Sequence, residues 1–487
     1  MESYVSEVGY VTKSNGYLMY IEGLPTVKIN TILTHQSGSK AIVTSLDKTS
    51  LLALMLDQTK PKPGDEFKIF AEHISIPVGP QVLGRVLSPM GETIDDKASL
   101  TKTGKAGLTR EVKIDSSAPG ISKRHVVDEQ FQTGLTIVDG LVPIGKGQRE
   151  LIIGEPRSGV SAFIIDIIAN QKNTNTICIY TAIGKSELEI KQYASSIESI
   201  GANSYSLLVA ASSSSPAPLI MLAPQTGLTI AEQFAQDGHD VLVILDDMGL
   251  HAKYLREIAL IAEQVPGRES YPGNIFNQHA RLIERAGNFN QEKGRKPVSI
   301  TLLPIIRVIS ESIASYITTN LMAMTDGHML FSSELSAAGS YPSVDTAGSV
   351  TRVGRQTQHP LLRELSDRIR ALLARYEEVR SYSRFGPELT QNTLATLNQS
   401  EIILELLRQE DHDYRDIPLQ VALLALPFTR FLALKDASFV KRNKKIIVNA
   451  LREQPEFSQL YKSLELSLDS FIQQIDQRSD VLNKLCQ

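Results

Sequence analysis

The chain has 487 residues, too many for one hydrophobic core, so two to four domains are expected. Its formal net charge of −4 argues against the strongly basic surface typical of proteins that bind nucleic acid or anionic membranes. Two cysteines, Cys178 and Cys486, are too few for a disulfide framework or a cysteine-ligated metal cluster. No targeting leader is recognised after Met1, and no apolar run approaches the ~20 residues of a membrane helix.

The first predicted elements are short strands. Between about residues 7 and 72, apolar and polar residues alternate, with turn residues at 14–16, Gly23, Gly38 and Gly64. Short strands at this spacing are typical of a small barrel or sandwich. The alternative is an irregular β layer on the next domain. We predict an N-terminal β-barrel over residues 1–73.

The pattern changes at about residue 74. Apolar runs with the length of strands alternate with helix-like segments, and the runs are residues 150–153, 176–182, 206–210, 240–245 and 299–303. Continuous apolar strands that alternate with helices indicate a mostly parallel sheet covered on both faces. We therefore predict an α/β domain over residues 74–360.

The remainder of the chain is predicted to be helical. Apolar residues recur with helical spacing over 361–382, 390–408, 417–433 and 439–454, and Pro455 is expected to end the last of these helices. A C-terminal helical bundle over residues 361–487 follows from this pattern.

A degenerate phosphate-binding loop follows the first strand of the α/β domain. The nucleotide loop G-x-x-x-x-G-K-[S/T] is matched by Gly154, Gly159 and Ser161, but Val160 replaces the lysine. The loop lies between an apolar strand and a predicted helix, where a phosphate loop belongs. Ser161 and Asp246, at the end of another apolar strand, are the candidate Mg²⁺ ligands. The alternative is that the glycines serve only a tight turn and that Ser161 only caps the helix.

Three sequence blocks carry a resemblance to a known family. They are QTGLTIVDGLVPIGKGQRE at 132–150, Asp246-Asp247 with PGRESYPG at 266–273, and GSVTRVG at 348–354. Together they closely resemble the alpha subunits of F-type (rotary) ATP synthases, from about Val8 to past Phe439. The resemblance implies an N-terminal β-barrel, a central RecA-like P-loop domain and a C-terminal helical domain, in agreement with the pattern above.

The resemblance also implies a function. Three alpha and three beta subunits of that family alternate around a central gamma shaft, and the beta subunits catalyse. Alpha subunits bind a nucleotide that does not exchange, and they supply an arginine to the beta site. The matching residue is Arg352, whose guanidinium could stabilise charge on a transferring phosphoryl group. The alternative is a surface arginine at a loop-to-helix junction.

Further partners and a location follow from the same resemblance. A peripheral-stalk subunit is a further implied partner. Membrane contact is expected only through partners, at the cytoplasmic face of a bacterial cell membrane, and nucleic acid is not an expected partner.

The chain departs from the family pattern around the nucleotide. Arg157 stands in place of glutamine and could fold over phosphates or point to solvent. Lys185 stands where catalytic subunits have a water-positioning glutamate, so hydrolysis at this chain's own site is not expected. Further departures are Ser312, Thr318, Leu394 and Ala395. ATP or ADP with Mg²⁺ would use Gly154, Arg157, Gly159, Ser161 and Asp246, and the missing lysine predicts weak or no binding.

Two other functions are compatible with parts of this sequence pattern. A structural alpha-like subunit of a related rotary motor, not coupled to ion transport, fits the degenerate loop and the short segment before the barrel. A homohexameric translocating ATPase is disfavoured, since such a ring hydrolyses nucleotide in most of its subunits. The choice between H⁺ and Na⁺, the direction of the reaction, and nucleotide occupancy stay open at this point.

Overall fold

The computed structural model places most of the chain in two compact units. It describes residues 7–95, 97, 110–114, 116–291, 294–308, 313–383, 391–458, 460, 464–465 and 467–486. Unit 1 comprises residues 1–126, 146–153 and 171–326, and unit 2 comprises 127–145, 154–170 and 327–487. This division differs from the three predicted sequence domains, whose boundaries stay a prediction.

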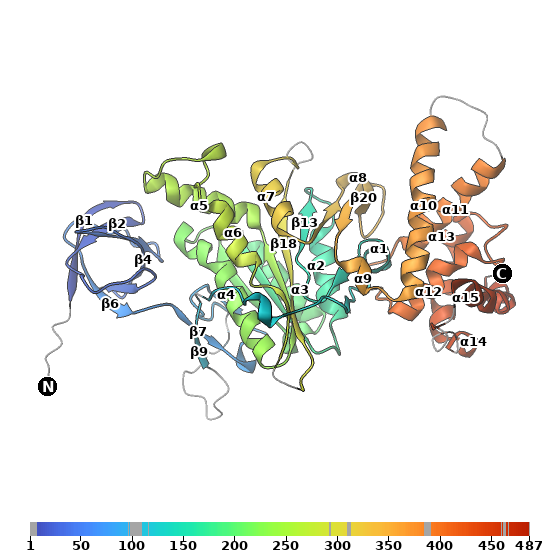
Figure 1. The fold of residues 1–487 in the computed structure, drawn as a ribbon, viewed down its shortest axis with the longest axis horizontal. Helices are drawn as coiled ribbons and strands as arrows, with labels where there is room; N and C mark the ends of the chain where they lie inside the picture. The colour runs from blue at the N-terminus through green and yellow to red at the C-terminus, as the bar shows by residue number, and fades with distance from the viewer. Residues whose placement is uncertain are drawn as a thin grey trace. The chain divides into compact units, whose positions relative to one another are not determined.

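The N-terminal part of unit 1 is a closed six-stranded barrel with strand order β1-β2-β5-β4-β3-β6, as predicted (Figure 1). Its strands are β1 (Val8–Asn15), β2 (Leu18–Glu22), β3 (Ile32–His35), β4 (Lys40–Leu46), β5 (Leu51–Met55) and β6 (Glu66–Ala71). Alternate residues point inward to one buried core that includes Met19, Leu33 and Phe67. Gly9 lets the strands approach, since a Cβ there would lie 2.5 Å from Ile21 Cγ2.

A mostly parallel sheet forms the centre of unit 1. Its strands run in the order β13-β18-β16-β14-β15-β8, and β17 adds to β18 in the antiparallel sense. The strands are β8 (Val86–Leu87), β13 (Glu150–Gly154), β14 (Thr176–Lys185), β15 (Ser206–Ser212), β16 (Asp240–Asp246), β17 (Gly287–Phe289) and β18 (Val298–Arg307). All ten residues of β14 are buried, as expected for a strand covered on both faces. Two short antiparallel pairs accompany the sheet, β10 (Arg124–His125) with β17 and β7 (Ser75–Val78) with β9 (Arg110–Lys113).

Helices connect and cover these strands. They are α3 (Glu187–Ser199), α4 (Ala217–Gln236), α5 (Met248–Ile261), α6 (Ile275–Ile283) and α7 (Tyr316–Met324). The start of α3 is set by a capping box between Ser186 and Glu189, and Asp247 caps α5 by accepting from the N–H groups of Gly249 and Leu250. Both caps follow directly on strand ends, so side chains at the carboxyl edge of the sheet are held in defined positions.

Unit 2 begins with short elements and ends in helices. The short elements are β11 (Gln130–Phe131), α1 (Thr136–Leu141), β12 (Ile144–Gly145), α2 (Val160–Asn170), β19 (Gly327–Phe331), α8 (Ser333–Ala337), β20 (Val344–Thr351) and α9 (Gly354–Thr357). Strands β19 and β20 pair in the antiparallel sense. Asp139 of α1 is fully buried and accepts from Gln420 Nε2 at 2.8 Å, so it ties α1 to the helical region.

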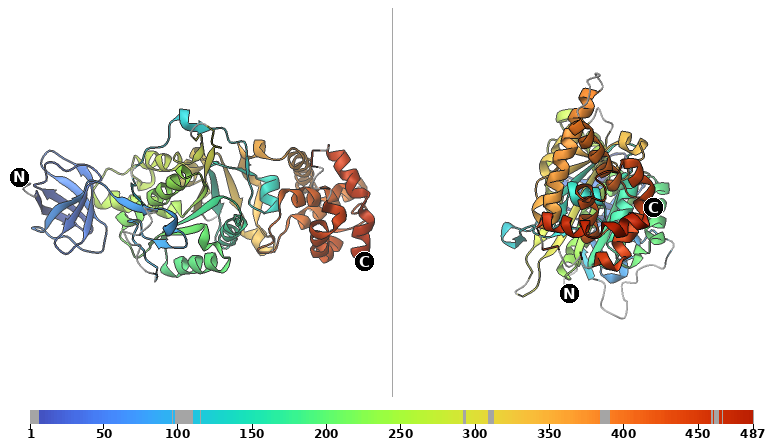
Figure 2. Two further views of the ribbon diagram at one scale, coloured as in Figure 1. Left: turned by 90° about the horizontal axis from the view of Figure 1, so that it is seen from below. Right: turned by 90° about the vertical axis from the view of Figure 1, so that its right-hand side faces the viewer.

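The predicted helical region is confirmed, with one correction. Its helices are α10 (Pro360–Ser383), α11 (Gln391–Leu407), α12 (Ile417–Ala425), α13 (Ala437–Glu453), α14 (Pro455–Ser458), α15 (Leu468–Asp476) and α16 (Ser479–Leu485), several of them labelled in Figure 1 and seen from two further sides in Figure 2. The prediction of one helix over 417–433 is wrong, because α12 ends at Ala425 and a 3₁₀ turn (Leu426–Phe428) contains Pro427. Among the described helices, none has the length and apolarity needed to span a bilayer.

A buried histidine pair joins three helices of unit 1. His251 of α5 and His279 of α6 are 2% and 1% exposed, and His251 Nδ1 lies 3.2 Å from His279 Nε2. His251 Nε2 also lies 3.2 Å from the carbonyl oxygen of Met221 in α4. Burial lowers the pKa of His251 to about 4, and burial together with the neighbouring His251 lowers the pKa of His279 to about 3.

This pair predicts acid sensitivity of unit 1. Between pH 6.5 and about 4, the unfolded chain binds protons at these histidines that the folded chain does not, so stability falls as the pH is lowered. Each unit of pKa depression corresponds to about 1.4 kcal/mol. Thermal unfolding followed across this range should show a falling midpoint, with a shallower slope in His279→Gln. Asn277, an exposed residue of α6 that does not titrate, supplies the control Asn277→Ala, whose slope should match that of the unsubstituted chain.

Candidate functional site

The predicted phosphate loop has the backbone of such a loop. It leaves β13 at Gly154 and enters α2 at Val160, so the predicted strand–loop–helix order is present. Gly159 has φ +80°, and Arg157 has φ +62°, a left-handed conformation that is uncommon for a residue with a side chain. The main chain therefore retains the tight turn that two glycines allow.

The side chain in the lysine position has a different role. Val160 is 2% exposed, and its Cγ2 lies 2.5 Å from the point where a Cβ on Gly154 would stand. The valine methyl groups thus fill the inside of the turn against Gly154. The position contributes apolar packing and no cation to a phosphate.

Hydrogen bonds tie the loop to other parts of unit 2. Glu155 accepts through Oε2 from the backbone N–H of Ser333 at 2.8 Å and from its hydroxyl at 2.6 Å. Ser158 donates its hydroxyl to Glu155 O at 2.6 Å, and its own carbonyl accepts from the hydroxyl of Ser343. These bonds join polar groups of the loop to Ser333 and Ser343 of the same unit.

The remaining loop residues lie at the surface. Ser161 stands in the first turn of α2 with its side chain exposed, and the side chain of Arg157 is exposed as well. The glycines, Arg157 and Ser161 belong to unit 2, whereas Asp246 belongs to unit 1. The two predicted metal ligands are thus found in separate units.

Asp246 lies in a cluster of charges at the carboxyl edge of the parallel sheet. Lys185 ends β14, Asp246 ends β16 and Arg307 ends β18, and these three strands are neighbours. In the registers of these strands, Ala182 pairs with Asp246 and Asp246 pairs with Ile305. Because parallel strands end at one edge, the three charged residues are brought together there.

Both carboxylate oxygens of Asp246 face cations. Lys185 Nζ lies 2.9 Å from Oδ1 in an ion pair. Arg307 Nη2 donates to Oδ2 at 3.0 Å, and the Tyr180 hydroxyl donates to the same oxygen at 3.0 Å. The side chain of Asp246 is 0% exposed and that of Lys185 4%, so the contacts are made in the interior.

Electrostatics keeps this carboxylate ionised. Burial alone would raise the pKa of Asp246, but the charges of Arg307 and Lys185 and their hydrogen bonding outweigh burial and lower it. Burial would lower the pKa of the Arg307 guanidinium, and Asp246 raises it instead. Asp247, which caps α5, has a raised pKa because of its burial and the adjacent Asp246 charge.

The residues around Asp246 do not fit a magnesium ion. Mg²⁺ requires oxygen ligands in an octahedral arrangement and normally keeps several waters. Asp246 has no exposed surface, and both of its oxygens are already contacted by cationic groups. A further positive charge placed about 4 Å from each of these cations would be opposed by roughly 4 kcal/mol per unit charge at an effective dielectric constant of 20. The structure thus disagrees with the expected metal role of Asp246.

In contrast to the buried and ion-paired Asp246, Arg352 is an exposed cation on a backbone that is held by hydrogen bonds. It lies between β20 and α9 with its side chain exposed. Thr351 donates its hydroxyl to Pro143 O at 2.9 Å, and the N–H of Gly354 donates to Thr351 Oγ1 at 3.1 Å. Among the described residues, Arg352 makes no hydrogen bond or ion pair, whereas the nearby Arg355 is paired with Asp367 at 2.6 Å.

The other predicted departures have varied surroundings. Thr318 is fully buried in α7, with its hydroxyl 2.9 Å from that of Ser315. Leu394 and Ala395 are exposed on α11. Ser312 lies outside the described residues.

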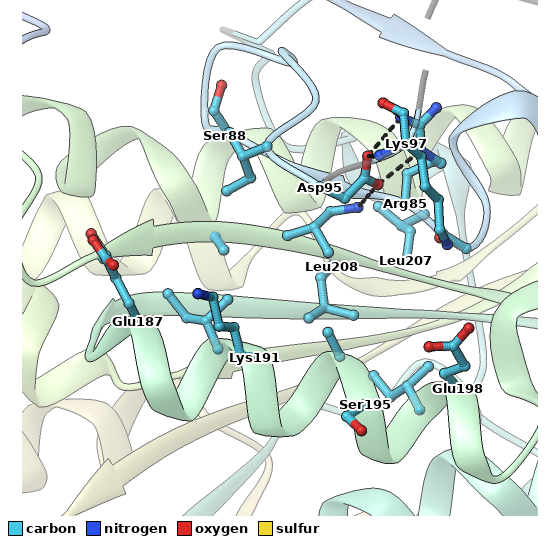
Figure 3. A pocket seen from close by; sticks show the side chains of 18 of the residues that line it. Arg85, Ser88, Asp95, Lys97, Glu187, Lys191, Ser195, Glu198, Leu207 and Leu208 are labelled. Carbon is cyan, nitrogen blue, oxygen red and sulfur yellow. Dashed lines mark hydrogen bonds and ion pairs between the residues drawn. The ribbon is translucent and has the colours of Figure 1, made fainter. Parts of the chain in front are cut away.

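A pocket of about 830 Å³ lies elsewhere in unit 1, between α3, β15 and the segment around β8 (Figure 3). None of the predicted site residues lines it. Two of its lining residues, Arg85 and Asp95, form a two-pronged ion pair of 2.7 and 2.8 Å, and the hydrogen bonds from Arg85 contribute most to lowering the pKa of Asp95 to about 2. The pair is therefore satisfied within the chain.

Sequence reasoning missed Arg307 and Tyr180. A signal existed, because each of three buried strands ends in a charged residue and parallel strands end at one edge. The predicted strand 299–303 stopped short of Arg307, which ends β18 (Val298–Arg307), and the order of the strands was not predicted.

Comparisons with known proteins agree with this architecture. The model of the nucleotide-binding domain of the ATP synthase alpha/beta family matches residues 134–351, and that of the family's C-terminal domain matches 358–478. The ATP synthase subunit alpha of Lactobacillus helveticus is 37% identical over 421 residues, which cover 86% of this chain and 82% of that protein. ATP synthase subunit alpha 1 of Mycoplasmopsis pulmonis is 37% identical over 92% of this chain and 84% of its own length. The subunit alpha of Limosilactobacillus fermentum is 34% identical over 98% and 94%, respectively.

The hydrogen bonds from Thr351 to Pro143 and from Gly354 to Thr351 form a clamp that holds the backbone next to Arg352. This clamp predicts that a side chain at position 354 is destabilising. A Cβ at this position would lie 1.8 Å from the carbonyl oxygen of Pro143. Gly354→Ala must displace the Thr351–Pro143 contact, and we expect a cost of roughly 1–3 kcal/mol, seen as a lower thermal midpoint. Gly273→Ala is the matched control, since a Cβ there meets nothing within 4 Å. Equal midpoints for the two variants would contradict the clamp.

Proposed function

The chain belongs to the ATP synthase alpha/beta family, and from that premise we propose that it is a non-catalytic alpha subunit of an F-type ring. In this role it alternates with catalytic beta subunits in a 3:3 ring around a gamma shaft and supplies Arg352 to a beta site. ATP synthesis or hydrolysis, coupled to proton transport, is then an activity of the complex. The complex sits peripherally at the cytoplasmic face of a bacterial membrane, with a peripheral-stalk subunit as a further partner.

One observation carries the proposal, the contrast between Arg352 and Asp246. Arg352 is an exposed guanidinium without a hydrogen bond or ion pair to any described residue of its own chain, on a backbone held by Thr351. A permanently charged fork of N–H donors in this state is suited to phosphate oxygens supplied from outside the chain. Asp246, by contrast, is buried and neutralised from within.

The chain's own loop supports the non-catalytic part of the proposal. Val160 gives the loop apolar packing where the family's phosphate-binding lysine would stand. Lys185 directs its ammonium group at Asp246 and cannot orient an attacking water as a carboxylate does. ATP or ADP at Gly154, Gly159 and Ser161 would lack both the lysine and a metal ligand at Asp246.

We expect Arg352→Ala to abolish most turnover of the assembled complex. An arginine that stabilises the charge of phosphoryl transfer is worth about 10³–10⁵ in rate, so a loss of roughly 10³-fold in ATP hydrolysis is predicted. Arg352→Lys keeps the positive charge but lacks the planar guanidinium, so its turnover should lie between that of the unsubstituted complex and that of Arg352→Ala. The measurement is steady-state ATP hydrolysis by the reconstituted ring.

The chain offers a matched control for that substitution. Arg355 lies three residues away, is also exposed and is already paired with Asp367. Arg355→Ala should therefore retain turnover near that of the unsubstituted complex. Full turnover in Arg352→Ala would contradict the proposal that this arginine acts at the beta-subunit site.

We also expect the isolated chain to bind Mg·ATP poorly. Loss of one charged hydrogen bond removes about 1.5–3 kcal/mol, a roughly tenfold to hundredfold loss of affinity. Isothermal titration calorimetry of the purified chain with Mg·ATP should give a dissociation constant weaker than micromolar, with a beta subunit as the positive control. Arg157→Ala in the same titration tests whether that arginine folds over the phosphates, and micromolar or tighter binding by the unsubstituted chain would contradict the prediction.

A further inference from the structure

We infer that Lys185 and Arg307 are fixed internal counter-ions of Asp246, and that this chain takes no divalent cation at that carboxylate. The inference concerns the strand edge of unit 1 alone. It stands or falls separately from the proposed action of Arg352 on a neighbouring subunit, because its tests measure metal binding and stability of this chain and not turnover of the complex.

Access is the first step of the argument. The side chain of Asp246 is 0% exposed, with Lys185 Nζ at 2.9 Å from one oxygen and Arg307 Nη2 at 3.0 Å from the other. The Tyr180 hydroxyl occupies a further position on Oδ2 at 3.0 Å. A hydrated divalent ion would have to displace these groups before it could reach the carboxylate.

The neighbouring carboxylates are committed elsewhere. Asp247 Oδ1 accepts from the N–H groups of Gly249 and Leu250, and its Oδ2 accepts from the N–H of Arg307 at 3.3 Å. Glu189 Oε2 accepts from the N–H and hydroxyl of Ser186. Recruiting either carboxylate to a metal would remove the caps of α5 or α3. Across the described part of the chain, no group of three or more acidic, histidine or cysteine side chains has the arrangement of a metal site.

The charge balance completes the argument. A buried carboxylate needs compensation, and two cations provide it from the strands on either side of β16. Phenol donation from Tyr180, whose ring stacks on Tyr193 at 4.3 Å, fixes the position of Oδ2. The edge is therefore balanced by groups on β14 and β18, and a divalent ion there would be repelled by both cations.

The first test is direct metal binding by the full chain. Mn²⁺, whose bound and free forms differ in their electron paramagnetic resonance signal, is titrated into the purified chain and into Asp246→Asn. We expect the unsubstituted chain and Asp246→Asn to bind the same amount of Mn²⁺, because no ion is held by the carboxylate of Asp246. One equivalent bound by the unsubstituted chain and lost in Asp246→Asn overturns the inference.

The second test is a reversal of sign in a mutant cycle. In the unsubstituted chain, Asp246→Asn leaves two buried cations without their partner, and we expect the thermal midpoint to drop by roughly 5–15 °C. In a Lys185→Met, Arg307→Met background the same substitution removes an uncompensated carboxylate, so it should raise the midpoint. The Lys185→Met, Arg307→Met chain should also be stabilised by millimolar Mg²⁺ at constant ionic strength, whereas the unsubstituted chain should not respond.

An exposed ion pair supplies the control for this mutant cycle. Arg110 and Asp237 are 49% and 40% exposed and 2.7 Å apart, so a cycle of Arg110→Met and Asp237→Asn should change the midpoint by about 2 °C or less. If Lys185→Met, Arg307→Met fails to fold, folding of the triple variant that adds Asp246→Asn gives the same reversal. Asp246→Asn with an effect of the same sign and size in both backgrounds contradicts the inference.

Discussion

Burying a carboxylate is costly unless cations compensate its charge, and the carboxyl edge of the central sheet is arranged around one such compensated carboxylate, Asp246. Asp246 ends β16, and the strands on either side of β16 end in Lys185 and Arg307. Their contacts of 2.9 and 3.0 Å balance the charge and fix the ends of three strands at once. Because of these contacts, the carboxylate is not available to hold Mg²⁺, which is the role of the corresponding aspartate in P-loop nucleotide hydrolases.

The phosphate loop shows a parallel change. Its turn is retained through Gly159, while Val160 packs on Gly154 and Glu155 is engaged by Ser333. Interactions that a ligand would supply are replaced by interactions within the chain. Arg352 differs, since its backbone is held by Thr351 and Gly354 while its exposed guanidinium makes no hydrogen bond or ion pair to a described residue. This contrast supports the proposed role of the chain as a non-catalytic ring subunit.

Local pattern was a good guide to the elements. The predicted strand 176–182 is found as β14 (Thr176–Lys185), and the predicted helix 439–454 as α13 (Ala437–Glu453). The first segment is a continuous apolar run, and the second has helical apolar spacing and the N-cap Asp436. The helix predicted over 417–433 failed where Pro427 interrupts it, since apolar spacing continued past the last residue that can keep helical hydrogen bonds. The antiparallel pair of β19 and β20 was not predicted either, because pairing sense is not encoded in the period of a single strand.

By itself the sequence determined the barrel, the parallel sheet, the helical region, the family and the loss of the loop lysine, because these depend on residue period, turn residues and motif spacing. Only the tertiary structure decided what Lys185 and Asp246 do. Asp246 and Arg307 are 61 residues apart in the chain, and their contact depends on strand order and register, which long-range packing sets. The same holds for the clamp between Thr351 and Pro143, whose close approach becomes visible only when both backbones are in place.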